Sequence, residues 1–188
     1  MVGNGGSALI SSGFSNDGSS GMASIESSPS GPNGVSGDIY ISSGHSEAGS
    51  SGEIALQTGL SRNGHGGSLS LKSGGGGGLS DGGDILLTAG QTSAPGRKGG
   101  SVTIVGGEGS SAHTSDGGDG GNIALLGGEA RGESSSDNGG SILIRGGSSF
   151  AGFGGSLDLI SGQSSEASSG DLCECVRLAF QFVQALSM

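Results

Sequence analysis

Basic residues are scarce in this sequence. Its 188 residues include seven Lys and Arg against 17 Asp and Glu, which gives a formal net charge of −10. Only Arg97 and Lys98 are adjacent to each other. Neutralising nucleic-acid phosphates requires clustered Lys and Arg, so the composition excludes a nucleic-acid partner.

Long apolar stretches are also missing. None approaches the ~20 residues that a membrane-spanning helix needs, so no membrane span is expected. Residues 1–6 have neither the charged nor the apolar region of a signal peptide, and none is predicted. The only two cysteines, Cys173 and Cys175, do not indicate a redox compartment. The chain opens directly into a repeat, which fits either a fragment of a longer protein or a complete protein whose first coil is uncapped.

Glycine dominates what is present, with 46 residues, and serine is nearly as frequent. Without periodicity this composition would indicate a disordered chain, so the repeat decides the class. Gly100–Gly107 shows the repeated phrase: Val102 and Ile104, two residues apart, lie on one face of a short strand between glycines. Loops such as His45–Ser51, Leu60–Gly66 and Gln91–Gly99 separate the phrases.

The phrase recurs along nearly the whole chain, mostly at intervals of 15 or 16 residues. The first two copies are degenerate, with alanine at the first apolar site. The phrases begin at Gly6, Gly21, Gly37, Gly52, Gly67, Gly83, Gly100, Gly121, Gly140 and Gly155.

The repeat predicts an all-β fold, a parallel β-solenoid of strand–loop units about 15–16 residues long. Two apolar side chains contribute about 1.5–3 kcal/mol each when buried, whereas ordering each residue costs roughly 1–2 kcal/mol. A phrase therefore needs neighbours that share a sheet and a core. Two phrases per coil, forming two facing sheets, are favoured over one phrase per coil. An antiparallel meander is the alternative, although loops of this length exceed those of ordinary hairpins.

The composition changes after the repeat, which predicts a repeat domain over residues 1–170 and a C-terminal amphipathic cap or tail over 171–188. Apolar residues from Leu172 to Leu186 fit one face of a short helix that closes the open end of the sheets. Part of the same segment, Val176 to Phe182, equally fits a strand.

No residue set indicates catalysis, a cofactor or a metal. The three histidines His45, His65 and His113 stand at different offsets in the repeat, so they do not form a stacked metal site. No Gly-x-Ser-x-Gly elbow is followed by a helix, and the glycine runs lack the Lys-Ser/Thr ending of phosphate loops. The protein is therefore expected not to be an enzyme.

Residues 117–122 resemble the calcium-binding repeat of RTX-type β-rolls. The match occurs once and has Asn122 where an aspartate belongs, so this kind of calcium site is not expected. Loop carboxylates such as Asp81 and Asp119 are expected to bind cations loosely at most.

An apolar strip on one outward strand face is the candidate interaction surface. The alternative is that these residues are scattered exposed side chains without a shared role. The strip consists of Leu86, Thr88, Ala124, Leu126 and Ile160.

The repeat region from Gly6 to about Gly170 resembles the glycine- and serine-rich β-solenoid repeats of surface proteins, adhesins and extracellular fibres. This resemblance implies a rigid, non-catalytic structural or adhesive scaffold at the cell surface or outside the cell, whose partners are copies of itself or surface glycans. The alternative is a module that binds ice or carbohydrate through a flat sheet face. Only Thr88 and Thr103 occupy outward strand sites, which is a poor threonine array for ice.

Overall fold

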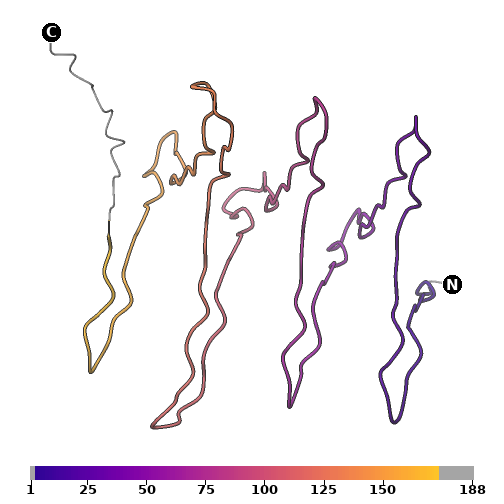
Figure 1. Ribbon diagram of the computed structural model, residues 1–188, viewed down its shortest axis with the longest axis horizontal. Coiled ribbons are helices and arrows are strands. Elements are labelled where there is room, and N and C mark those ends of the chain that lie inside the picture. Colours follow the sequence, from indigo (N-terminus) through magenta and orange to yellow (C-terminus); the bar gives the residue numbers. More distant parts are fainter. Residues whose placement is uncertain (1–2, 174–188) are drawn as a thin grey trace. The chain divides into compact units, whose positions relative to one another are not determined.

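The chain has no regular secondary structure in the part that the structure describes. The structure is a computed structural model, and it describes residues 3–173. These residues run as extended segments, bends and isolated turns, with neither a helix nor a β-strand among them (Figure 1). The prediction of an all-β parallel solenoid with two facing sheets is therefore wrong.

The predicted capping helix over 171–188 falls almost entirely outside the described residues. Of this segment the structure describes Asp171, Leu172 and Cys173, and none of the three is helical. The chain divides into two units, Met1–Leu86 and Leu87–Met188. Both units consist of the same elements, extended phrases joined by loops that double back on themselves (Figure 1).

The alternation of side chains along the phrases is present in the structure. From Ile39 to Leu159, the two apolar residues of each phrase are between 49% and 67% exposed. Large side chains directly between or after them, such as Tyr40 and Leu126, are between 80% and 88% exposed. The paired residues thus share the more sheltered face of each extended segment, as a period of two requires.

That sheltered face does not form a core. No described residue is buried, and Ile39, Leu71 and Ile104 keep exposed fractions of 50%, 62% and 61%. Within residues 3–173 the backbone hydrogen bonds all join residues of a single loop or turn, the glycines that bound the loop included, and none joins the apolar pair of one phrase to that of another. A parallel sheet requires a continuous ladder between neighbouring strands, and that ladder is missing.

The energy balance of the phrases explains this outcome. A half-exposed Ile or Leu recovers only part of the free energy of full burial, which is about 1.5–3 kcal/mol. The surrounding glycines and serines lose roughly 1–2 kcal/mol each when their backbone is fixed, and glycine loses the most. Two apolar residues per phrase do not offset that cost unless a neighbouring phrase covers them.

Candidate functional site

Seven of the described loops are closed by pairs of hydrogen-bonded glycines, which we call necks. In each neck the amide of the glycine that starts a phrase donates a hydrogen bond to the carbonyl of the glycine that ends the previous one. The donor–acceptor distances lie between 2.8 and 3.0 Å. Necks of this kind join Gly21 to Gly13, Gly83 to Gly74, Gly100 to Gly90, Gly121 to Gly107, Gly140 to Gly128, Gly155 to Gly147 and Gly170 to Gly162.

In three necks the two chain segments approach so closely that only glycine fits at the residue before the neck. A Cβ on Gly106, Gly127 or Gly146 would overlap the carbonyl oxygen of the glycine across the neck. The next residue along the chain is different, since a Cβ on Gly107, Gly128 or Gly147 would meet open space. Close backbone approach therefore accounts for the first glycine of each of these Gly-Gly pairs.

Five loops share a side-chain hydrogen bond, which closes the tip. A serine two residues after the glycine that begins the loop accepts a bond at its Oγ from the amide three residues further on, an arrangement typical of serine turns. The distances lie between 2.9 and 3.1 Å. These bonds join Ser15 to Gly18, Ser46 to Gly49, Ser61 to Gly64, Ser149 to Gly152 and Ser164 to Ala167.

We call these five segments the serine loops: 13–21, 44–52, 59–67, 147–155 and 162–170. All five have the sequence pattern Gly-x-Ser-x-x-Gly/Ala-x-x-Gly. Ser15, Ser46 and Ser61 are half-buried in a chain that is otherwise almost wholly exposed. In loop 59–67 the two arms also approach closely, because a Cβ on Gly67 would lie 3.1 Å from the Cβ of Thr58.

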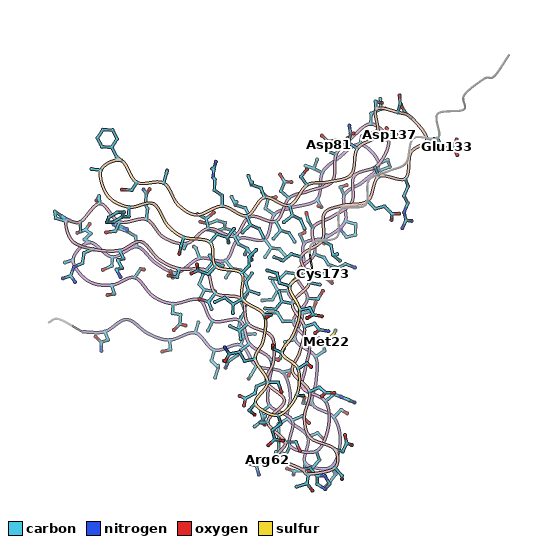
Figure 2. The ribbon with its side chains drawn as sticks, turned by 90° about the vertical axis from the view of Figure 1, so that its left-hand side faces the viewer. Met22, Arg62, Asp81, Glu133, Asp137 and Cys173 are labelled. Carbon is cyan, nitrogen blue, oxygen red and sulfur yellow. The ribbon has the colours of Figure 1, made fainter. Side chains whose placement is uncertain are left out.

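The two tip residues after each serine vary within this constant pattern. They are Asn16 and Asp17, Glu47 and Ala48, Arg62 and Asn63, Phe150 and Ala151, and Ser165 and Glu166. Figure 2 shows Arg62 at the outer end of its loop. Phe150, like Phe153 three residues later, is completely exposed. The same loop backbone thus presents acidic, basic, polar and aromatic side chains to solvent.

Loop 128–140 lacks the serine-loop pattern but is rich in local polar contacts. The amide of Asp137 donates to the carbonyl of Ser134 at 3.0 Å, and the amide of Ser134 donates to Asp137 Oδ2 at 3.0 Å. Before this turn, Arg131 Nε and Glu129 Oε2 form an ion pair at 3.0 Å. Both side chains of the pair are largely exposed, so it contributes little to stability.

The residues of the predicted interaction face are all exposed to solvent. Leu86, Leu126 and Ile160 are 86%, 87% and 85% exposed, and Thr88 and Ala124 are also exposed. Ala124 and Leu126 belong to one phrase. Leu86 is in the unit Met1–Leu86, whereas the other four residues are in the unit Leu87–Met188. Since no sheet forms in the described part, these residues do not line a sheet face.

The three histidines lie in loops, as predicted. His113 is the one with side-chain hydrogen bonds, and its Nδ1 lies 3.2 Å from the Oγ of Ser115. Among the described residues no group of three or more His, Cys, Asp or Glu side chains is placed to hold a metal ion. No helix in that part of the chain has the length and apolar character to span a membrane.

The serine loops were not recognised from the sequence, although a signal for them exists there. When the repeats are aligned on their apolar pairs, the loops between them are treated as spacers and are not compared. Aligning the loops on the glycines that bound them shows that Ser15, Ser46, Ser61, Ser149 and Ser164 share one offset. Searches of protein-family models, curated proteins and solved structures gave no match to this chain.

Proposed function

We propose that this protein is a non-catalytic repeat scaffold with a structural or adhesive role, and that it acts through the tips of its loops. The observation that carries the proposal is the contrast within the serine loops. Their bounding glycines and turn serine recur in five copies, whereas their two tip residues differ in charge, size and polarity. Loops on a constant backbone are a common way of carrying binding residues.

The exposure of the chain supports a binding role over a catalytic one. Catalytic groups act from sites that exclude water and hold each group in a fixed position. No polar or charged side chain is buried in the part of the chain that the structure describes. The backbone hydrogen bonds of the described chain close loops and turns, and these position backbone turns rather than reactive side chains.

Binding to ice or carbohydrate through a flat sheet face is not retained, because the described chain contains no sheet. The partners that we propose are a second copy of this chain or a surface glycan, each contacted by loop tips. The exposed Phe150 and Phe153 suit either partner, since an aromatic ring offers a large contact area with few rotatable bonds.

The test uses the full chain with two probes, a glycan array and sedimentation equilibrium over a wide range of protein concentration. We expect glycan binding or concentration-dependent association. Either should weaken in a variant that combines Arg62→Ser, Phe150→Ser and Phe153→Ser. The matched control combines Leu86→Ser, Leu126→Ser and Ile160→Ser, which are also largely exposed but lie on phrases, and it should behave as the wild type.

The control makes the proposal falsifiable. A chain that stays monomeric and binds no glycan would overturn the scaffold role. Binding that is lost in the phrase variant and kept in the tip variant would move the contact surface from the loops to the phrases.

A further inference from the structure

Four Asn-Gly dipeptides lie within the described chain, at Asn4, Asn33, Asn63 and Asn138, and all four asparagines are exposed. Such pairs can deamidate without an enzyme. The glycine nitrogen attacks the side-chain carbonyl carbon of asparagine, the bond from that carbon to Nδ2 breaks, and ammonia leaves. Water then opens the resulting succinimide to aspartate or isoaspartate. The residue after the asparagine matters because glycine has no Cβ to hinder the approach.

The structure distinguishes these sites by the state of the attacking nitrogen. The amide of Gly64 donates to Ser61 Oγ at 3.0 Å, inside a serine loop. The amide of Gly34 donates to the carbonyl of Gly31 at 3.2 Å. The amide of Gly139, like that of Gly5 near the start of the chain, has no hydrogen-bond partner within residues 3–173. An amide held in a hydrogen bond must leave that bond before it can attack.

We propose that Asn138 is a site of spontaneous deamidation and that the Ser61 hydroxyl slows the same reaction at Asn63. The Nδ2 atom of Asn138 donates to the carbonyl of Ser136 at 2.9 Å. That bond is exposed to water and is therefore easily exchanged for a bond to solvent. The bond from Asn138 Nδ2 to Ser136 does not involve the Gly139 nitrogen, which remains without a hydrogen bond within residues 3–173.

The product changes loop 128–140. Deamidation places a new carboxylate directly after Asp137 and adds a negative charge to a loop that already contains Glu129 and Glu133. The isoaspartate form also lengthens the backbone between the Ser134–Asp137 turn and the neck glycine Gly140. This inference does not depend on the proposed function.

The experiment incubates the full chain at mildly alkaline pH and follows each asparagine by peptide mapping, with digestion at acidic pH to suppress reaction during handling. We expect Asn138 to deamidate several-fold faster than Asn63 in the wild type. In Ser61→Ala the rate at Asn63 should rise several-fold while that at Asn138 stays constant. Ser61→Thr keeps a hydroxyl at this position and should keep Asn63 slow.

Two results would overturn the inference. One is equal rates at Asn63 and Asn138 in the wild type. The other is an unchanged rate at Asn63 in Ser61→Ala. A change at both asparagines in Ser61→Ala would also count against it, because a general loosening of the chain, rather than the loss of one hydrogen bond, would then explain the data.

Discussion

The amide nitrogen of Gly140 lies 2.8 Å from the carbonyl oxygen of Gly128 and donates a hydrogen bond to it, across a loop of eleven intervening residues. This contact brings the end of one phrase to the start of the next. Equivalent bonds close six other loops. The backbone hydrogen bonds of the described chain therefore lie in its loops and turns, and the phrases are extended connections between them.

The neck of loop 128–140 predicts a sharp difference between two adjacent glycines. A Cβ at Gly127 would overlap the carbonyl oxygen of Gly140, whereas a Cβ at Gly128 would meet nothing within 4 Å. Gly127→Ala should open the neck and raise the amide exchange rate of Gly140 several-fold, as expected for the loss of one exposed hydrogen bond. Gly128→Ala is the control and should leave that rate unchanged; equal effects of the two substitutions would refute the neck geometry.

The serine loop 147–155 allows a comparable test of its tip. Ser149 Oγ accepts a bond from the amide of Gly152 at 2.9 Å, and Ser148 has no hydrogen bond of this kind. Ser149→Ala should expose the Gly152 amide to solvent and increase the temperature coefficient of its NMR chemical shift. Ser148→Ala should not do so. If Gly152 responds identically in both variants, the serine does not close the loop.

The turn in loop 90–100 depends on a positive φ angle. The amide of Arg97 donates to the carbonyl of Ala94 at 3.2 Å, with Pro95 and Gly96 at the centre of the turn and φ of 68° at Gly96. This is the residue order of a type II turn. Gly96→Ala should disfavour the turn by about 1–2 kcal/mol, because an L-residue rarely adopts this conformation. NMR should then show loss of the Arg97 hydrogen bond.

Gly99→Ala is the control for this prediction. A Cβ there would make only an ordinary contact, 3.5 Å from the carbonyl oxygen of Gly90, and its φ is not in the left-handed region. The turn hydrogen bond should survive in that variant. A turn that persists in Gly96→Ala would contradict the account.

The sequence predicts some features of the structure correctly. The repeated phrase and its bounding glycines correspond to the extended segments and the glycines that bound the loops. The predicted alternation of side chains is also present, since Ile142 and Ile144 are less exposed than Leu143 between them. A period of two reports which side chains share a face. It does not report whether another strand covers that face, and the solenoid prediction assumed that it does.

The candidate site was missed for a related reason. The strip containing Leu86 and Leu126 depends on a sheet that the described residues do not form. Its residues are exposed, but they do not share a sheet face. The serine loops depend on short side-chain-to-backbone bonds, such as Ser61 to Gly64, and these leave no hydrophobic pattern. Their signal is a serine two residues after the glycine that begins each loop, and it is found only when the loops are aligned with one another.

Site-resolved amide hydrogen exchange tests the central claim most directly. The account predicts fast exchange, close to that of an unstructured peptide, at the phrase amides of Ile39, Ile104 and Ile142, together with slower exchange at the neck amides of Gly21, Gly83 and Gly140. Strong protection along the phrases would contradict it, because hydrogen bonds between phrases would then hold the chain together in place of loop closure.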